Sequence, residues 1–482
     1  MERNGKQFDV IIVGAGISGI NAAYRIQTQL PNYTYTIIEA RTDLGGTWDL
    51  FKYPGIRSDS DLFTFGFQFN PWLRDNPIAE GSAIKEYVRE TATKYGIDKH
   101  ILYNHRLSSA DWSSNENTWS LTVNHNDSEE TYTARYVIFG TGYYNYQDPL
   151  NPDIPGLDAF QGQIVHPQFW PNDFQYKDKK IVIIGSGATA ITLLPNLADH
   201  AARVTMLQRS PTYILSLPNR SSSRWLSYIL PNALYIRLQR MIYIYVNRIF
   251  FLFCQRFPKF SRWLLKSNVR KQLPTHIPHD PHFKPKYNPL GAAVGKADVK
   301  TDTIREVTKN GIMLNSGEQL DADIIITATG LRLQIAGGSA LSVDGKKIDT
   351  GEKYLWNGVM LQDVPNAAFV IGYTNASWTL GADATAQFVC RLLKTLESRK
   401  LIAAVARLKE KDAATLQERP LLNLKSTYVS VAESVLPKAA DRGPWQPRDH
   451  YLKDMKFAQA GDIDTGLEFM PGPSLRLRPK MS

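Results

Sequence analysis

Residues 8–19 read Phe8-Asp-Val-Ile-Ile-Val-Gly14-Ala-Gly16-Ile-Ser-Gly19, and this stretch decides the fold. Its first six residues form a short apolar run rich in β-branched side chains, which predicts a buried parallel strand. Gly14 permits a tight turn, Gly16 lets the backbone approach a pyrophosphate, and Gly19 lets a helix pack close to the strand. A helical pattern follows over residues 20–30. This is the first half of a dinucleotide-binding βαβ unit.

An acidic residue completes this unit. A second strand is predicted over residues 34–38, and Glu39 stands at its end. A carboxylate there can accept hydrogen bonds from both ribose hydroxyls and disfavours a 2′-phosphate, so the site suits FAD better than NADPH. The residues expected to bind FAD in this unit are Gly14, Gly16, Ser18, Gly19 and Glu39.

A second unit of the same kind begins at residue 180. The apolar run 180–184 leads into a glycine turn and a helical pattern, and a further strand follows over residues 203–207. Ala190 replaces the third glycine, which is a permitted variant of this turn. The strand leads to Arg209, whose guanidinium can bind a 2′-phosphate bidentately, although a lone arginine can also be a solvated surface residue. The residues expected to bind NADPH in this unit are Gly185, Ser186, Gly187, Ala188, Thr189, Ala190, Gln208 and Arg209.

The composition indicates a globular protein with a basic surface. The chain has 482 residues, of which 43% are hydrophobic and 21% charged, and its net charge is +10. Such a surface can attract phosphates, including NADPH, and anionic membranes. The sequence contains no RNA- or DNA-binding module that we recognise, so we expect no nucleic-acid partner.

Cysteine usage and the N-terminus indicate a cytoplasmic protein. Cys254 and Cys390 make neither a metal-ligand cluster nor a disulfide framework, so we expect no metal and a reducing compartment. Residues 1–9 are polar and predict no signal peptide. No apolar run is long enough to span a bilayer.

The order of these motifs predicts an α/β fold with two Rossmann-like dinucleotide-binding domains. Residues 145–155 are rich in Pro, Asn and Asp, which favours a domain boundary there. The predicted parts are the N-terminal FAD-binding part, 1–150; the NADPH-binding domain, 151–330, with a helical insertion at about 212–300; and the C-terminal FAD-binding part with a tail, 331–482.

Residues 235–260, inside the insertion, have a helical pattern crowded with aromatic side chains. One interpretation is a helix buried against the substrate pocket, and we favour it. The alternative is an amphipathic segment that makes a peripheral membrane contact and admits lipophilic substrate.

The segment between the two nucleotide-binding units follows the pattern Phe-x-Gly-x-x-x-His-x-x-x-Trp-Pro. Its residues are Phe160, Gly162, His166 and Trp170. A linker with a buried His and Trp would explain them, but between two dinucleotide units the pattern resembles the fingerprint of the Baeyer–Villiger type of class B flavin-dependent monooxygenases. We expect these residues to hold the linker between the domains and not to act as acid or base.

Residues 45–59, from Gly45-Gly-Thr-Trp48 to Asp59, are similar to a second signature of these enzymes. The extension after Asp59 resembles the branch with thioamide-activating and long-chain-alkane monooxygenases. In relatives this loop runs along the flavin, and a strand near Leu107 contacts the adenine of FAD. The resemblance therefore adds Gly46, Thr47, Trp48, Asp59 and Leu107 to the FAD site, Arg57 and Ser58 to the NADPH site, and Asp59 as the catalytic residue.

The resemblance implies a reaction. NADPH would reduce FAD, and without a redox cysteine pair or a metal O2 is the simplest electron acceptor. The implied intermediate is a C4a-peroxyflavin that inserts one oxygen atom into a lipophilic ketone, or that oxidises a sulfur or alkyl substrate.

One segment departs from the relatives. There a Tyr-Asn-Pro segment continues to an arginine that supports the peroxyflavin, but here Pro289 is followed directly by Leu290-Gly-Ala-Ala. Lys284, Lys286 or Lys296 could substitute only as point charges. Two alternatives therefore stay open, an uncoupled NADPH oxidase and a flavin-binding protein without turnover.

Overall fold

The computed structural model describes residues 6–211, 219–221, 223–272, 280, 282, 298–422 and 427–472. The chain divides into two compact units. Unit 1 comprises residues 1–46, 87–145 and 333–482, and unit 2 comprises residues 47–86 and 146–332.

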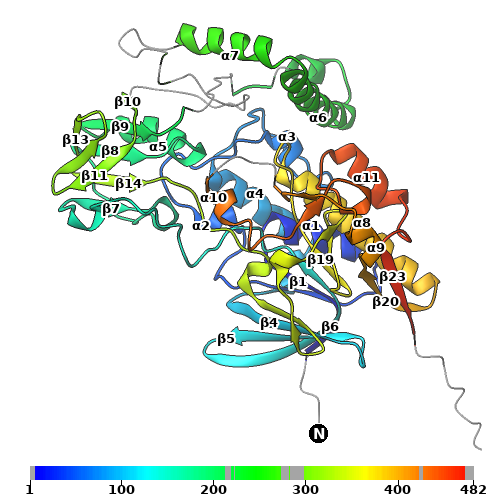
Figure 1. Cartoon of the computed structure of the whole chain (residues 1–482). Coiled ribbons are helices and arrows are strands. Elements are labelled where there is room, and N and C mark those ends of the chain that lie inside the picture. The colour runs from blue at the N-terminus through cyan, green and yellow to red at the C-terminus, as the bar shows by residue number, and fades with distance from the viewer. Residues whose placement is uncertain are drawn as a thin grey trace, which may run out of the picture. The chain divides into compact units, whose positions relative to one another are not determined.

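Unit 1 is built on a nine-stranded sheet with the order β16-β15-β4-β5-β6-β1-β2-β3, and β19 also pairs with β6 (Figure 1). Its parallel part contains β1 (Lys6–Val13), β2 (Tyr35–Ile38), β3 (Ile101–Leu102), β6 (Ser128–Phe139) and β19 (Ala367–Phe369). The central strand β1 ends in four buried residues, as expected for a strand covered on both faces.

An antiparallel meander extends this sheet. It consists of β4 (His105–Ser113), β5 (Thr118–His125) and the first part of β6, and β15 (Ala340–Val343) with β16 (Lys346–Lys347) continues beyond β4. Trp112 and Trp119 lie opposite each other on β4 and β5 and are fully buried. They belong to a core that also contains Val13, Ile38 and Phe139 from the parallel part.

Two helices of unit 1 pack directly against each other, α1 (Ile17–Gln29) and α8 (Trp378–Ser398). Arg25 on α1 pairs with the buried Asp383 on α8 at 2.8 Å. The other elements of unit 1 are η1 (Ile97–His100), η5 (Ala336–Gly338), η6 (Thr350–Glu352), β17 (Leu355–Trp356), β18 (Met360–Leu361), β20 (Leu401–Ala406), α9 (Glu410–Ala413), β21 (Glu418–Arg419), α10 (Thr427–Val431), β22 (Ala439–Ala440), η7 (Gly443–Trp445), α11 (Tyr451–Ala460) and β23 (Leu467–Pro471).

Unit 2 contains a five-stranded sheet in which every pairing is parallel, with the order β10-β9-β8-β14-β7. Its strands are β7 (Gln163–Val165), β8 (Lys180–Ile184), β9 (Arg203–Gln208), β10 (Asp298–Thr301) and β14 (Ile324–Thr327), and α5 (Ala188–Ala198) follows β8. A small antiparallel sheet is formed by β11 (Ile304–Thr308), β12 (Gly311–Leu314) and β13 (Gln319–Asp321).

Unit 2 also contains the helical insertion. Its long helices are α6 (Asn232–Arg256) and α7 (Pro258–Gln272), which lie side by side near the top of Figure 1. None of the described helices is long and apolar enough to cross a membrane. The shorter elements of unit 2 are α2 (Thr47–Leu50), α3 (Leu62–Phe65), η2 (Leu157–Ala159), η3 (Pro167–Phe169) and η4 (Arg224–Tyr228); α4 (Gly81–Lys94) begins in unit 2 and ends in unit 1.

The predicted α/β class with two Rossmann-like units is confirmed. Residues 47–86 cluster with unit 2, whereas the predicted boundaries assign them to the FAD-binding part, and the domain boundaries stay predictions. The preference for a buried helix at 235–260 is wrong. On α6 only Tyr235, Gln239, Ile244 and Cys254 are buried.

Candidate functional site

The first glycine turn has the geometry that its sequence predicts. Gly14 adopts φ +100°, and a Cβ there would lie 2.9 Å from the carbonyl oxygen of Gly140. A Cβ on Gly19 would overlap the carbonyl oxygen of Gly14. Both positions therefore require glycine, one for the left-handed turn and one for the close approach of α1 to β1.

The N-terminus of α1 fits a pyrophosphate. Gly16 is the N-cap, makes no side-chain cap, and is followed by no acidic residue in the first turn. Backbone N–H groups at such an end attract an anion. Ser18 is buried and its Oγ accepts a hydrogen bond from Trp378 Nε1 at 3.0 Å, which ties α1 to the start of α8. The FAD contacts of Gly16 and Ser18 stay predictions.

Glu39 is fastened to the glycine turn. It is buried, its Oε2 accepts the Ala15 N–H at 2.7 Å, and its Oε1 accepts the Arg41 N–H at 2.9 Å. The carboxylate therefore lies beside the turn that would hold the pyrophosphate. This position is compatible with the predicted ribose contact.

Two further predicted FAD residues lie near this turn. Gly46 adopts φ +56°, and its neighbour Gly45 donates its N–H to the Ala15 carbonyl at 3.1 Å. Leu107 is buried on β4, where the pairing with β5 shifts register before Ser109. Such a bulge leaves one backbone residue outside the ladder, which suits a strand whose backbone is to contact a ligand.

The second glycine turn repeats this geometry in unit 2. Gly185 adopts φ +135°, and a Cβ there would overlap the carbonyl oxygen of Ala328. Gly187 is the N-cap of α5, has no side-chain cap, and has no atom within 4 Å of where a Cβ would be. Ala188 and Thr189 open the helix, and Ala190 is fully buried where the first unit has Gly19. The N-terminus of α5 therefore also fits an anion.

The strand end beside this turn carries Gln208 and Arg209. Gln208 is buried and donates to Thr301 Oγ1 at 2.9 Å and to the His282 carbonyl at 2.7 Å. Its side chain thereby ties β9 to β10. Arg209 is exposed at the end of β9, and Ser186 of the glycine turn donates to the Ser210 carbonyl at 3.0 Å. The predicted NADPH contacts of these residues stay predictions.

The loop 47–59 packs on the helix of the second unit. Tyr53 is buried and its hydroxyl bonds to the Thr189 side chain, and burial raises the pKa of this tyrosine to about 12. A Cβ on Gly55 would overlap the side chain of Asn196, and Gly55 adopts φ +77°. These contacts explain why the segment clusters with unit 2.

Three predicted site residues follow in this loop. Asp59 is exposed on one side yet crowded by the loop, and this desolvation raises its pKa above the ordinary range, while the Arg57 guanidinium acts in the opposite direction. Ser58 is buried, and its hydroxyl donates to the Ser60 carbonyl at 2.7 Å, so it shapes the turn that presents Asp59. Earlier in the loop, Thr47 Oγ1 lies 3.4 Å from the Tyr146 hydroxyl, and the Trp48 ring contacts Phe65 edge-on.

Three residues of the fingerprint stretch belong to the unit 2 sheet, and its predicted role in holding the linker stays a prediction. Residues 163–165 form the edge strand β7, paired with β14, and His166 follows directly. A Cβ on Gly162 would overlap both the Asp323 carbonyl oxygen and the Phe160 ring, so glycine is needed for the strand to begin there. Phe160 itself is buried in the unit 2 core, and Trp170 contacts Phe174 edge-on.

His166 caps the short helix η3. Its Nδ1 accepts the Gln168 N–H at 3.2 Å, whereas Nε2 is buried without a hydrogen-bond partner among the residues described. Burial lowers the pKa of this histidine, so it is neutral near neutral pH. A neutral imidazole in a capping position favours the predicted structural role over acid–base work.

Sequence reasoning assigned no role to the contacts that hold α6 against α3. Asp61 is buried, caps α3 by accepting the Thr64 N–H at 2.8 Å, and accepts the Asn247 amide at 3.1 Å. Arg240 donates to the carbonyls of Phe63 and Gly66, both at 2.8 Å. Asn247 interrupts the apolar pattern of the helix, which is the sequence signal that could have revealed this contact.

The predicted residues are thus gathered in two groups. Unit 1 brings together the first glycine turn, Glu39, Gly46 and Leu107, and unit 2 brings together loop 47–59 and the second glycine turn. The sequence break after Pro289, with Lys284, Lys286 and Lys296, lies outside the described residues.

Comparison with known proteins decides the family. A family model described as flavin-binding monooxygenase-like matches residues 7–443. The chain belongs to this flavin-binding monooxygenase-like family. Within the family, the FAD-containing monooxygenase EthA of Mycobacterium tuberculosis is 43% identical over 97% of this chain and 99% of its own length. AlmA of Acinetobacter baylyi, named as a probable FAD-binding monooxygenase, is 42% identical over 96% of each chain.

Solved structures agree on the fold. An oxidised steroid monooxygenase bound to NADP superposes with a TM-score of 0.74 at 19% identity, covering 97% of this chain and 100% of the other. The cyclohexanone monooxygenase of Rhodococcus sp. Phi1 bound to NADP+ gives a TM-score of 0.72 at 19% identity with the same coverage. The family match and the FAD-containing relatives make this protein a flavin-dependent monooxygenase. The predicted family and enzyme class are confirmed.

Proposed function

We propose that this FAD- and NADPH-dependent monooxygenase inserts one oxygen atom of O2 into a lipophilic ketone, or oxidises a lipophilic sulfur or alkyl compound. One observation carries the proposal. The chain has two glycine turns, residues 14–19 and 185–190, each followed by a helix whose N-terminus has no side-chain cap; they are called the first and second cradle below. The strand beside the first cradle leads to an acid, Glu39, whereas the strand beside the second leads to an arginine, Arg209.

The residues of both cradles fit their cofactors. Glu39 would bind the ribose of FAD at the first cradle, and Arg209 would bind the 2′-phosphate of NADPH at the second. When bound, these groups supply hydride transfer and electrons for O2. The protein's own part is to orient them, and the Ser18–Trp378 and Tyr53–Thr189 contacts hold the two cradles in shape.

Asp59 is the proposed reaction-site residue. The loop that carries it packs on α5 through Tyr53 and Gly55, so its position follows that of the NADPH cradle. Because its pKa is raised, this carboxyl can take up and release a proton closer to neutral pH than an ordinary aspartate. The Arg57 guanidinium acts in the opposite direction and lowers the pKa.

The test is a balance of reactants and products. Purified protein is mixed with NADPH and O2, with and without a long-chain methyl ketone, and NADPH consumed, peroxide released and ester formed are measured together. The proposal predicts that peroxide falls as ester appears. Equal peroxide in both samples would instead indicate an NADPH oxidase, and no NADPH consumption would indicate flavin binding without turnover.

We further propose that α6 makes a peripheral membrane contact through which lipophilic substrate reaches the enzyme. An apolar stripe runs along its exposed side at helical spacing, formed by Leu234, Leu238, Met241, Tyr245, Ile249 and Leu252. Ile249 is 63% exposed. A surface helix normally turns its polar side outward, so this stripe is reversed relative to a helix that faces only water.

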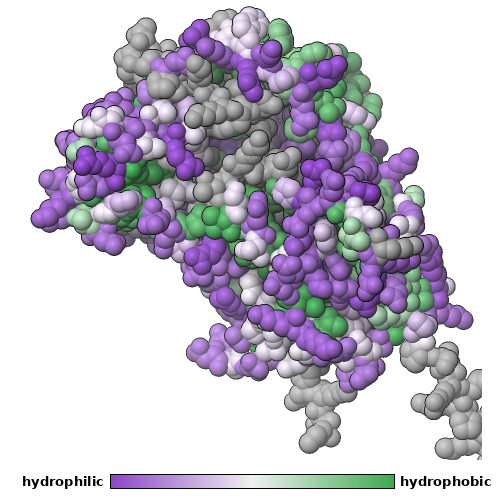
Figure 2. All heavy atoms as spheres, in the orientation of Figure 1, coloured by the Kyte–Doolittle hydropathy of each residue, from purple (hydrophilic) through white to green (hydrophobic). Residues whose placement is uncertain are grey.

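The charges around this stripe fit an anionic bilayer. Residues 232–272 carry nine Lys and Arg and no Asp or Glu. Exposed apolar groups on α7, including Phe260 and Trp263, extend the surface, and Figure 2 shows hydrophobic and hydrophilic side chains interleaved over the helical pair. Each basic group near an anionic surface contributes about 1 kcal/mol, and the apolar stripe adds the burial of its side chains.

Vesicle binding tests this contact with a matched pair of variants. Ile249→Ser removes a stripe residue, and Val431→Ser removes an equally exposed valine from α10 in unit 1, where 62% of the side chain is exposed. Ile249→Ser is expected to weaken binding to phosphatidylserine-containing vesicles by roughly tenfold, whereas Val431→Ser leaves it unchanged. Equal effects of the two variants, or equal binding to pure phosphatidylcholine, would contradict the proposal.

A further inference from the structure

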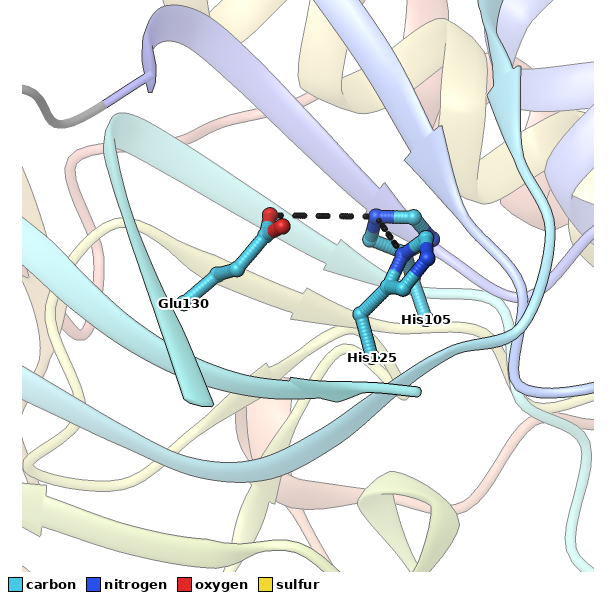
Figure 3. Close-up of side chains that lie close together, drawn as sticks. All are labelled: His105, His125 and Glu130. Carbon is cyan, nitrogen blue, oxygen red and sulfur yellow. Dashed lines mark hydrogen bonds and ion pairs between the residues drawn. The ribbon is translucent and has the colours of Figure 1, made fainter. Parts of the chain in front are cut away.

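Three side chains that the monooxygenase reaction does not use converge at one end of the unit 1 meander. His105 begins β4, His125 ends β5 directly opposite, and Glu130 lies on β6. One ligand atom from each lies within 4.8 Å of the others. Figure 3 shows the two imidazoles and the carboxylate pointing toward one another from three neighbouring strands.

The surroundings of His105 leave one nitrogen for a ligand. Nδ1 lies 2.6 Å from the Tyr103 carbonyl oxygen, which can only accept, so Nδ1 carries the proton and donates it. The lone pair is then on Nε2, which faces the cluster. Ligating histidines commonly have their second nitrogen held by a backbone carbonyl in this way.

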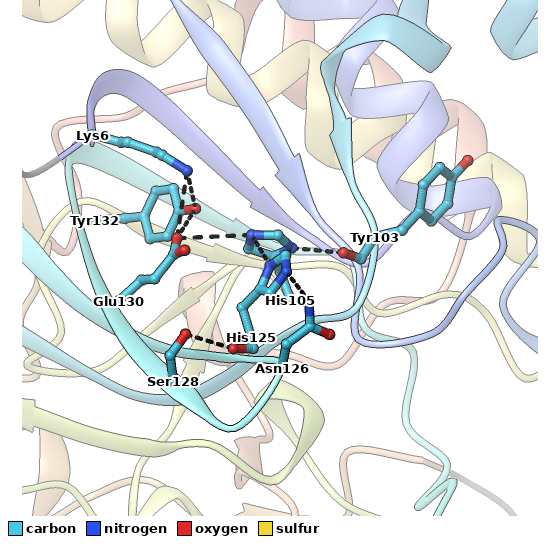
Figure 4. A network of polar contacts seen from close by, with 8 residues as sticks. All are labelled: Lys6, Tyr103, His105, His125, Asn126, Ser128, Glu130 and Tyr132. Atoms are coloured by element: carbon cyan, nitrogen blue, oxygen red, sulfur yellow. Dashed lines mark hydrogen bonds and ion pairs between the residues drawn. The ribbon is translucent and has the colours of Figure 1, made fainter.

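The other two side chains are prepared similarly. His125 Nε2 accepts the Asn126 side-chain N–H at 2.6 Å, so Nδ1 carries the proton and donates it to His105 Nε2 at 2.7 Å. Turning the Asn126 amide over offers its oxygen instead, moves the proton to Nε2 and frees Nδ1 for a ligand. Glu130 Oε2 accepts the Tyr132 hydroxyl at 2.6 Å, and this hydrogen bond together with Lys6 lowers the pKa of Glu130, so it is a carboxylate. Figure 4 shows these outer contacts around the three side chains.

We propose that His105, His125 and Glu130 bind one divalent transition-metal ion, with Zn²⁺ as the best fit. Two imidazoles and a carboxylate are a ligand set that Zn²⁺ accepts, and a fourth position would be open to water or another ligand. The ion would tie together three strands of unit 1. Its three ligands are not among the residues predicted to hold FAD or NADPH.

Binding requires a small rearrangement. His125 Nδ1 lies 2.7 Å from Nε2 and 3.0 Å from Nδ1 of His105, with the two rings at 84°, so it lies over the His105 ring. Zn–N bonds of about 2.0–2.1 Å place two ligating nitrogens roughly 3.3 Å apart in a tetrahedron. His125 must therefore turn slightly away, and its half-exposed position beside the Asn126–Asp127 turn allows this.

Lys6 allows a test in which metal binding should become stronger when a side chain is removed. Its Nζ lies 3.4 Å from Glu130 Oε2, and half of its side chain is exposed. The ammonium competes with a cation for this carboxylate and must move into water when the ion binds. Removing this charge should therefore strengthen metal binding, whereas it would weaken a cluster held together only by its own hydrogen bonds.

The experiment is a calorimetric titration of tag-free, FAD-loaded protein with Zn²⁺. One equivalent is expected to bind. His125→Ala and Glu130→Gln should each weaken binding roughly tenfold or more, Lys6→Met should tighten it severalfold, and His200→Ala, at an exposed histidine of unit 2, should leave it unchanged.

Several results would overturn the proposal. One is Zn²⁺ binding that survives in both His125→Ala and Glu130→Gln. Another is a loss of Zn²⁺ binding in His200→Ala as large as in these two variants. The third is no stoichiometric Zn²⁺ binding by the wild type at neutral pH. Thermal melting and FAD content of each variant separate lost metal binding from misfolding, and Glu130→Gln is the safer variant because its side chain is only half-buried on a strand.

Discussion

The two dinucleotide cradles of this protein share a backbone and differ in two side chains. Each has a strand, a glycine in the left-handed region and an uncapped helix N-terminus. The first has Gly19 and Glu39 where the second has Ala190 and Arg209. The comparison teaches that the same backbone turn is built in both units, whereas a single side chain, Gly19 or Ala190, sets how closely the helix approaches its strand. We propose that the residue at the strand end, Glu39 or Arg209, decides which dinucleotide each turn accepts.

The largest expected effect comes from giving each glycine turn the residue that the other has at its third conserved position, Gly19 or Ala190. Gly19→Ala forces a Cβ into the Gly14 carbonyl oxygen and should destabilise the protein by about 2–3 kcal/mol, with loss of bound FAD. Ala190→Gly creates no overlap and should cost roughly 1 kcal/mol through helix propensity. Thermal melting and the flavin-to-protein absorbance ratio measure both. Equal effects would mean that the two helices approach their strands in the same way.

The next effect concerns the strand ends. Arg209→Gln should raise the KM for NADPH by roughly 10- to 100-fold, because a charged hydrogen-bonding partner of the 2′-phosphate is lost. The KM for NADH should hardly change. Arg203→Gln, at the other end of the same strand, is the control. A similar rise of the KM for NADPH and for NADH would show that Arg209 does not recognise the 2′-phosphate.

A substitution of Asp59 tests whether the loop 47–59 carries a catalytic residue. The Asp59 carboxyl has a raised pKa, so ionising it costs the folded protein stability, and this cost develops as pH rises from the ordinary aspartate pKa through the raised one. Asp59→Asn removes this penalty and should leave the melting temperature at pH 7 unchanged or slightly higher, while turnover falls about 10- to 100-fold. In the wild type, the acid limb of the turnover profile should lie above the ordinary aspartate range. Loss of both stability and turnover would indicate a structural residue.

The smallest effect concerns the attachment of this loop to α5. Tyr53→Phe removes the hydroxyl that bonds to Thr189 and should cost about 1 kcal/mol. Because the pKa of Tyr53 is about 12, the effect should be constant between pH 6 and 9. Denaturant unfolding measures it. No change in unfolding free energy would indicate that the loop is held by its other contacts.

The sequence predicted both cradles because their determinants are local. Each cradle is specified by a strand, its glycines, a helix and a charged residue that lie within a few tens of residues of one another. Each of these features follows from a local property of the sequence. The placement of residues 47–86 could not be read in this way, since it depends on contacts of Tyr53 and Gly55 with a helix far along the chain. The strand before His166 was missed because three residues carry too little pattern.

The exposure of α6 and the His105 cluster show the same limit. Aromatic side chains at helical spacing indicate a helix but do not say whether protein covers its apolar side. His105, His125 and Glu130 come together only through the register of three strands, and the two histidines are unremarkable in the sequence. Neither histidine belongs to a metal-binding sequence motif, so the sequence alone does not reveal this cluster.

The most direct measurement is anaerobic mixing of the FAD-loaded protein with NADPH or with NADH while the visible flavin absorbance is followed. If the first cradle holds FAD and Arg209 of the second selects the 2′-phosphate, NADPH should bleach the flavin at concentrations roughly tenfold or more below those needed for NADH, and Arg209→Gln should abolish the difference. Equal bleaching by both nucleotides in the wild type, or none with either, would contradict the division of labour between the two cradles.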